Sequence, residues 1–317
     1  MVAMVAPSSP EPLAVLLMGP TCSGKTALSL ALGKLFHGEI ISCDSVAVYR
    51  GMDLGSAKPT PDEQAQLPHH LIDVCDPSTP FTAGDYSRLA RTALAAITAR
   101  NQLPIVTGGT GLYLRALTMG LFDGPPRQQS LRDRLTRSAQ RQPAGWLHRI
   151  LTRLDPTAAA RIHPNDTPKL IRALEICFTA RTSVTAAFAT GRDPLTGYRL
   201  LRIGLSPPRA GLYQRINLRA AAMFHNGLVE ETRSLLTRFG PVKALDALGY
   251  RQAVAVLNHQ LSLEEAIAAA QQGHRNYAKR QLTWFRREPD TLWIEDFGDS
   301  PTTTALAAAQ ISSYLTG

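Results

Sequence analysis

Residues 19–26 read Gly-Pro-Thr-Cys-Ser-Gly-Lys-Thr, and this stretch decides the fold. It fits the phosphate-binding pattern of a glycine, four free positions and Gly-Lys-Thr. An apolar stretch typical of a buried parallel strand (13–18) precedes it, and an apolar-periodic stretch typical of a helix (25–36) follows it. Backbone N–H groups and the helix dipole then point at bound phosphate oxygens. The residues expected to hold the phosphates are Gly19, Pro20, Thr21, Cys22, Ser23, Gly24, Lys25 and Thr26, with Thr26 also holding Mg²⁺.

Length, composition and charge narrow the class of protein. The 317 residues suffice for one large α/β domain and a smaller one. A net charge of +9 is typical of an enzyme that meets a polyanion such as tRNA or DNA, although a merely basic protein is as good an explanation. No apolar run approaches the ~20 residues of a membrane span, and residues 1–12 lack the regions of a signal peptide. The four cysteines show no CxxC spacing, so we expect a cytoplasmic protein with free thiols.

Apolar stretches alternate with helical patterns in both halves of the chain. Strands are expected at 13–18, 39–43, 70–74, 103–107, 198–205 and, weakly, 291–295. This alternation predicts an α/β fold, a P-loop NTPase-like parallel sheet flanked by helices. Between 121 and 197 the pattern is helical only, with helices expected at 131–140, 145–154, 156–162 and 166–178. We therefore expect an all-helical insertion domain at 121–197 within a core made of 1–120 and 198–317.

Two short segments follow strands that neighbour the phosphate loop. Asp44 ends the second strand, where a carboxylate can hold Mg²⁺ through water or act as a general base. Gly108-Gly109-Thr110-Gly111 follows the fourth strand, where glycines admit a ligand close to the backbone and Thr110 offers a hydroxyl. Ligands of such sheets bind at the carboxyl ends of the strands. Each segment also has a plain explanation, a turn or a helix cap.

Basic residues beyond the insertion suggest anion contacts. Arg215 and Arg219 lie four apart, so one helix face carries both and the pair can bind a pyrophosphate, although a solvated basic face fits the spacing equally. The stretch 279–287 interleaves basic and aromatic residues, which suits phosphate contacts and base stacking. Trp284 or Phe285 can equally be a core residue.

The residues alone leave three functions open. They support a magnesium-dependent enzyme that grips a di- or triphosphate beside a carboxylate and binds a polyanion. A kinase that uses ATP on a small metabolite competes with this, although 70–73 is a poor version of the second acidic motif of ATPases. A non-catalytic nucleic-acid-binding module is the third, and it has no use for Asp44 beside an intact Lys25 and Thr26.

Six further motifs follow the phosphate loop along the chain. They are Asp44-Ser-Val-Ala-Val-Tyr-Arg-Gly-Met-Asp-Leu-Gly-Ser-Ala-Lys-Pro59, Pro68-His-His-Leu-Ile-Asp73, Gly108-Gly-Thr-Gly-Leu-Tyr113, His163-Pro-Asn-Asp166, Leu248-Gly-Tyr-Arg251 and Lys279-Arg-Gln-Leu-Thr-Trp-Phe-Arg286. Together the seven motifs resemble the bacterial tRNA isopentenyltransferase (tRNA dimethylallyltransferase) family over about residues 13–295. The block at 44–59 is the most specific of them. Ala47 stands where many members carry glutamine, and Cys22 where alanine is frequent.

The resemblance implies transfer of a dimethylallyl group from dimethylallyl diphosphate to N6 of adenine 37 in tRNA, with release of pyrophosphate. The phosphate loop would hold the diphosphate of this donor rather than ATP. Lys25, Mg²⁺ on Thr26 and Arg219 would stabilise the leaving pyrophosphate. Asp44 would accept a proton from N6, Thr110 would position a substrate, and the target base would flip out of its stack.

The resemblance also implies which regions contact tRNA. The insertion would close on the anticodon stem-loop, and we expect the protein to act as a monomer. The tRNA-contact residues by family position are Asp44, Ser45, Val46, Ala47, Thr110, Arg132, Pro168, Lys169, Leu170, Ile171, Arg172, Asp246, Ala247, Leu248, Gly249, Tyr250, Arg251, Lys279, Arg280, Gln281, Trp284 and Arg286.

Overall fold

The computed structural model describes residues 11–122, 124–189 and 191–316, so the predictions for residues 1–10 lie outside it. The chain divides into two compact units, Met1–Thr118 with Leu195–Gly317, and Met119–Pro194. These boundaries lie within three residues of the expected ones. Among the described residues, no helix combines the length and the apolar character needed to span a membrane.

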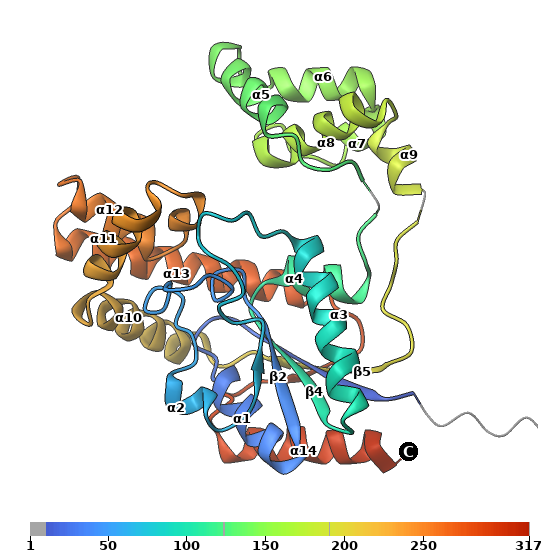
Figure 1. The fold of residues 1–317 in the computed structure, drawn as a ribbon, viewed down its shortest axis with the longest axis vertical. Helices are drawn as coiled ribbons and strands as arrows, with labels where there is room; N and C mark the ends of the chain where they lie inside the picture. Colours follow the sequence, from blue (N-terminus) through green and yellow to red (C-terminus); the bar gives the residue numbers. More distant parts are fainter. Residues whose placement is uncertain (1–10, 123, 190, 317) are drawn as a thin grey trace, which may run out of the picture. The chain divides into compact units, whose positions relative to one another are not determined.

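The first unit contains one parallel sheet of six strands (Figure 1). The spatial order is β3-β2-β4-β1-β5-β6, and every paired neighbour runs parallel. The predicted α/β fold class is therefore confirmed. The strands are β1 (Leu13–Met18), β2 (Gly38–Cys43), β3 (His69–His70), β4 (Leu103–Gly108), β5 (Arg199–Leu205) and β6 (Thr291–Ile294).

Alternating residues of β1 divide the core into two layers. Leu13, Val15 and Leu17 belong to a buried cluster with α1 (Lys25–Leu35) and α14 (Pro301–Thr316). The intervening residues 14, 16 and 18 belong to a cluster with α3 (Ala83–Ala99) and α4 (Gly111–Thr118) on the other face. Side chains of a strand point alternately to its two faces, so a continuous apolar run such as β1 indicates a strand covered on both sides. Figure 1 shows α3 along one side of the sheet and α14 beneath α1.

The remaining helices of this unit are a short one between β2 and β3 and a series that follows β5. They are α2 (Pro61–Gln64), α10 (Arg209–His225), α11 (Leu228–Phe239), a 3₁₀ turn (Lys243–Asp246), α12 (Tyr250–Leu257) and α13 (Leu263–Phe285). The long α13 begins with a capping box, because Ser262 accepts from the Glu265 N–H and Glu265 accepts from the Ser262 N–H. Its buried Phe285 joins the core beside the sheet, as one of the two alternatives for the 279–287 stretch predicted.

The third strand is shorter than the sequence predicts. An extended segment was expected at 70–74, but β3 ends at His70. Leu71 and Asp73 adopt positive φ angles of 61° and 56°, which break an extended run. The backbone of 73–75 instead hydrogen-bonds to residues 47–50, with the Asp73 N–H donating to the Ala47 carbonyl at 3.1 Å. The prediction failed because the apolar residues serve this loop pairing and not the sheet.

The second unit contains only helices among its described residues. They are α5 (Gln129–Arg141), α6 (Trp146–Leu154), α7 (Pro156–Ala159), α8 (Thr167–Ala180) and α9 (Val184–Ala189). Their apolar faces form a separate buried cluster that includes Leu151 and Leu174. The fully buried Glu175 carboxylate accepts from Arg172 at 2.6 Å and from Arg132 at 3.2 Å. Burial alone would raise the pKa of Glu175, but the bonds from Arg172 and the Gln128 N–H, with both guanidinium charges, lower it.

Candidate active site

The carboxyl ends of three adjacent strands lie in one row. Gly108 at the end of β4 pairs with Met18 of β1 on one side and with Cys43 of β2 on the other. The phosphate loop, Asp44 and Gly109 therefore leave the sheet at the same edge. A Cβ on Gly108 would lie 2.2 Å from the Cys43 carbonyl oxygen, so this position requires glycine for close packing.

The phosphate loop (19–26) turns sharply into α1. Gly24 precedes the helix with φ of 88°, and Cys22 also takes a positive φ of 64°. A Cβ on Gly24 would lie 2.7 Å from the Gly298 nitrogen, and the Gly298 N–H donates to the Ser23 carbonyl at 2.8 Å. The loop is therefore shaped by its own glycines and supported from outside by the segment after β6.

Lys25 carries the central charge of this loop. Its Nζ donates to the carbonyls of Gly19 at 3.0 Å and Pro20 at 2.7 Å. Burial, followed by the nearby charge of Arg219, lowers the pKa of Lys25 from 10.5 to about 8. An anion placed beside this amine would stabilise its charged form.

The predicted arginine pair lies at the same cavity. Arg219 on α10 donates through Nη2 to the Thr21 hydroxyl. Arg215 one turn earlier pairs with Asp299 at 2.9 Å and lies over the ring of Phe297 at 3.7 Å. Both guanidinium groups line the cavity with the phosphate loop, so helix spacing placed them correctly.

Asp44 holds a turn and faces the cavity. Its Oδ1 accepts from the backbone N–H groups of Val46 at 2.8 Å and Ala47 at 3.2 Å. Its Oδ2 has no hydrogen-bond partner among the described residues, and the side chain lines the cavity. The turn-cap explanation is thus correct for one oxygen and leaves the second oxygen available for chemistry.

Thr110 supports the turn that follows Asp44. Its hydroxyl accepts from the Ser45 N–H at 3.0 Å and donates to the Ser45 hydroxyl at 3.3 Å. Thr110 is not among the residues that line the cavity, unlike Asp44 and Gly109. Its structural contacts therefore serve the geometry of residues 44–47.

Two residues of α13 complete the site, Tyr277 and Gln281, and sequence reasoning assigned no role to Tyr277. Tyr277 lines the cavity and its hydroxyl donates to the Gly109 carbonyl at 3.4 Å; burial, followed by the charge of Asp44, raises its pKa. Gln281 is buried and joins two loops, because its Oε1 accepts from the Thr21 N–H at 2.8 Å and its Nε2 donates to the Gly109 carbonyl at 2.9 Å. Only their spacing of four residues, which places both on one face of the helix, could have linked them in advance.

One cavity of about 430 Å³ unites these groups. Lys25, Arg215 and Arg219 supply positive charge, and Asp44 supplies a carboxylate, all within the first unit. Thr26 also lines it, and its hydroxyl has no hydrogen-bond partner in the described part of the chain. Mg²⁺ prefers oxygen ligands and usually keeps waters and substrate phosphates as further ligands. Thr26 and Asp44 fit that pattern, and no cluster of three or more His, Cys, Asp or Glu among the described residues offers an alternative metal site.

The residues predicted to contact tRNA are placed unequally. Ala47, Leu170, Ile171, Gly249, Tyr250 and Gln281 are buried. Arg132 and Arg172 hold Glu175, and Tyr250 donates to Glu231 at 2.6 Å. Half-buried positions are Ser45, Val46, Ala247, Leu248 and Trp284, and exposed ones are Pro168, Lys169, Asp246, Arg251, Lys279, Arg280 and Arg286. The exposed residues can meet a polyanion directly, and the buried ones shape the surface around them.

The fold and cavity define a parallel α/β protein in which the 19–26 loop, Arg215, Arg219 and the Asp44 carboxylate line one cavity. A family model described as IPP transferase matches residues 47–288. A protein named tRNA dimethylallyltransferase from Koribacter versatilis is 59% identical over 290 residues, which cover 91% of this chain and 94% of the relative. The chain belongs to the IPP transferase family.

Solved structures of tRNA-modifying transferases are also similar to this chain. The full-length tRNA isopentenylpyrophosphate transferase from Bacillus halodurans is 38% identical with a TM-score of 0.71, and the match covers 96% of this chain and 97% of that chain. A eukaryotic dimethylallyltransferase structure acting on tRNA shares the fold with a TM-score of 0.78 at 24% identity, over 96% of this chain and 79% of that chain. The recognition made from the seven motifs is confirmed.

Proposed function

We propose that this protein transfers a dimethylallyl group from dimethylallyl diphosphate to N6 of adenine 37 in tRNA and releases pyrophosphate. The observation that carries the proposal is the cavity in which Lys25, Arg215 and Arg219 face Asp44. The positively charged side chains suit a diphosphate, and the carboxylate suits a nucleobase amine. Membership of a family whose relatives are named for this activity supports the same reaction.

The phosphate loop and Arg219 bind the donor and stabilise its leaving group. Negative charge grows on the pyrophosphate oxygens as the bond between the allylic carbon and oxygen stretches. Lys25 and Arg219 are already held at the cavity by hydrogen bonds, so they need little reorganisation to stabilise that charge. Thr26 and Asp44 would hold Mg²⁺, which would supply further positive charge for the leaving group.

Asp44 accepts the proton that the acceptor must lose. The N6 lone pair forms the new bond to the allylic carbon, the carbon–oxygen bond breaks toward pyrophosphate, and one N6 proton passes to Oδ2 of Asp44. Oδ1 meanwhile keeps the turn at Val46 and Ala47 in place. The adenine must leave its stack to reach the cavity, as in other enzymes that modify bases.

The tRNA contacts are assigned to exposed basic residues of both units. Lys279, Arg280 and Arg286 lie on or just after α13, which also provides Tyr277 and Gln281 to the cavity. In the helical unit, Lys169 and Pro168 are exposed on the first turn of α8. We assign the helical unit to the anticodon stem-loop, where phosphate contacts position the RNA and splayed bases are read.

The protein acts as a monomer in the cytoplasm under this proposal. One unit of one chain supplies every residue of the cavity. All four cysteines are free thiols, which suits a reducing compartment.

The reaction is tested with purified protein, Mg²⁺, unmodified tRNA and dimethylallyl diphosphate. Nucleosides from digested tRNA are identified by mass spectrometry, and pyrophosphate is measured in parallel. We expect one C₅H₈ addition on the adenosine at position 37 for each pyrophosphate released. A parallel reaction uses γ-labelled ATP without the prenyl donor. Unmodified tRNA together with phosphate transfer from ATP would reject the proposal in favour of a kinase.

A further inference from the structure

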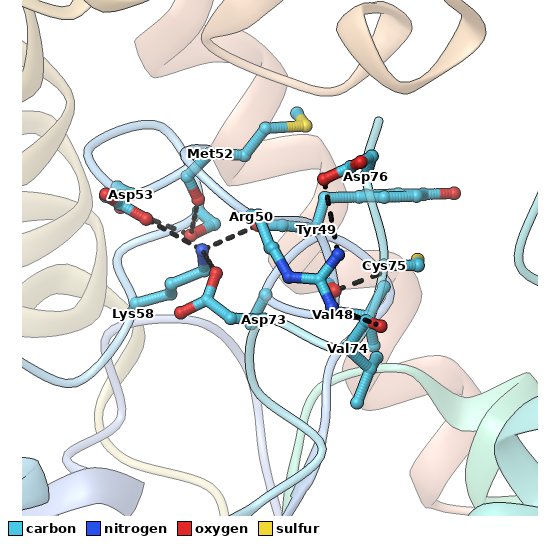
Figure 2. A network of polar contacts seen from close by, with 12 residues as sticks. Val48, Tyr49, Arg50, Met52, Asp53, Lys58, Asp73, Val74, Cys75 and Asp76 are labelled. Carbon is cyan, nitrogen blue, oxygen red and sulfur yellow. Dashed lines mark hydrogen bonds and ion pairs between the residues drawn. The ribbon is translucent and has the colours of Figure 1, made fainter. Parts of the chain in front are cut away.

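Residues 44–59, here called the acceptor segment, begin with Asp44 and end beside Lys58. Lys58 lines the same cavity as Asp44, yet its side chain is only 4% exposed. Its Nζ donates to the Tyr49 carbonyl at 2.6 Å, to Asp53 Oδ1 at 2.7 Å and to Asp73 Oδ1 at 2.6 Å. Figure 2 shows this ammonium between the two carboxylates.

The Lys58 ammonium has no donor left for a substrate. A lysine ammonium offers three N–H donors, and three acceptors already surround this one. Two of the acceptors are carboxylates, which offset the cost of burying the charge. Lys58 therefore differs from Lys25, whose partners are two backbone carbonyls and whose surroundings add the positive charge of Arg219.

Lys58 is linked to Asp44 through Asp73. The Asp73 carboxylate accepts from Lys58, and the Asp73 backbone N–H donates to the Ala47 carbonyl at 3.1 Å. The Ala47 backbone N–H in turn donates to Oδ1 of Asp44. Asp73 reaches both partners because its backbone takes a positive φ of 56°. A displacement of Asp73 after loss of the Lys58 contact would therefore move the turn that orients the Asp44 carboxylate.

The middle of the acceptor segment, residues 53–55, is fixed independently. Glu231 of α11 accepts from the backbone N–H of Leu54 at 3.0 Å and from the Tyr250 hydroxyl at 2.6 Å. Gly55 packs against the Tyr250 ring, where a Cβ would lie 2.4 Å from a ring carbon. Because Glu231 keeps residues 53–55 in place, loss of Lys58 would displace residues 44–47 and leave the middle of the segment attached.

We propose that Lys58 is a positioning residue for the acceptor: it fixes the acceptor segment against Asp73 so that Asp44 meets the adenine amine. The inference rests on the proposed function. It contrasts with direct binding of the donor diphosphate by Lys58, which its place in the cavity would otherwise suggest. A misplacement of about 1 Å at a reacting group can cost about 100-fold in rate.

The test compares Lys58→Gln with wild-type protein and with the matched control Arg88→Gln. Arg88 is exposed on α3, and among the described residues its side chain pairs only with Asp85, at 3.4 Å. We expect Lys58→Gln to lower kcat about 10- to 100-fold and to raise the KM for tRNA. The Kd for dimethylallyl diphosphate should stay within about threefold of wild type, since the phosphate loop is untouched. Arg88→Gln should match wild type in all three quantities.

A second pair of variants separates positioning from a charge effect on the donor. In Lys58→Gln/Asp73→Asn, two amides replace the ion pair and can hydrogen-bond to each other. We expect kcat to recover several-fold over Lys58→Gln alone, a non-additive result typical of residues in contact. If Lys58→Gln does not fold, Asp73→Asn gives the same test, because Asp73 is 43% exposed and tolerates neutralisation. Its expected loss of kcat is several-fold with unchanged donor affinity.

Three results would overturn the inference. They are an unchanged kcat in Lys58→Gln, a tenfold or larger loss of donor affinity, and no recovery in the double variant. Wild-type protein that does not prenylate tRNA in the same assay would reject the proposed function instead, so the two failures are distinguishable.

Discussion

The phosphate loop and the acceptor segment face one cavity but are built in different ways. Residues 19–26 use their own backbone: Lys25 donates to carbonyls five and six residues earlier, and Gly24 supplies the left-handed turn. The acceptor segment depends on side chains outside it, namely Asp73 at Lys58 and Glu231 at Leu54. A loop with local contacts can be recognised as a motif with a known shape, whereas a segment with distant partners takes its shape only in the folded chain.

The largest expected effect concerns Asp44, which holds a turn and is the proposed proton acceptor. Asp44→Ala and Asp44→Asn should each lower kcat by about 10²- to 10⁴-fold, because each removes the proton acceptor. Asparagine keeps an oxygen for the N–H groups of Val46 and Ala47, so it preserves the turn. Single-turnover assays give the rates, and tRNA and donor affinities should stay within about threefold. Near-normal turnover in Asp44→Asn would show that the residue is only a turn cap.

Replacement of Gln281 tests whether the conformation of the phosphate loop also depends on a contact from outside the motif. Gln281→Ala removes the buried partner of the Thr21 N–H and the Gly109 carbonyl. The loss should lower the free energy of unfolding by about 1–3 kcal/mol and weaken donor binding. Chemical denaturation and calorimetric titration measure these quantities. Gln272→Ala on the exposed side of the same helix is the control, and equal effects of both changes would contradict a special role for Gln281.

The pH dependence of donor binding sharpens the description of Lys25. The pKa of Lys25 in the free protein is about 8, so the amine is mostly charged at pH 7 and mostly neutral at pH 9. A bound diphosphate favours the charged form, and its affinity should therefore fall about tenfold between pH 7 and pH 9. Titrations across this range check the slope. Lys25→Met should bind more weakly with a flat profile, and an equally steep profile in that variant would assign the dependence to another group.

The smallest expected effect concerns Lys279, which lies outside the phosphate loop and the acceptor segment. Lys279→Ala should weaken tRNA binding a few-fold. The slope of log K against the logarithm of the salt concentration should become less steep by about one unit, because one fewer phosphate contact releases counterions. Filter-binding at several salt concentrations measures the slope. Lys34→Ala, at the exposed carboxyl end of α1, removes an equal charge far from the carboxyl edge of the sheet and should leave the slope unchanged. Identical slopes for wild type and Lys279→Ala would place Lys279 away from the RNA.

Local patterns determined most of what the sequence alone could establish. The apolar run of β1, the glycine turn and the helix beginning at Lys25 fixed the parallel α/β class and the place of the anion site. Helix spacing placed Arg215 and Arg219 together, since residues four apart share a helix face. The seven motifs identified the family. These features depend on neighbours within a few residues, so they can be recognised without the fold.

Only the tertiary structure decided how the phosphate loop and the acceptor segment come together at one cavity. It showed that the backbone of residues 73–75 pairs with the acceptor segment rather than extends β3, that Gln281 joins Thr21 to Gly109, and that Lys58 donates to three acceptors. It also placed the side chains of Leu170, Ile171 and Tyr250 in buried cores. These outcomes depend on hydrogen bonds and packing between residues up to 260 positions apart. No local periodicity or spacing encodes such contacts, because they form only when distant segments are brought together by the core.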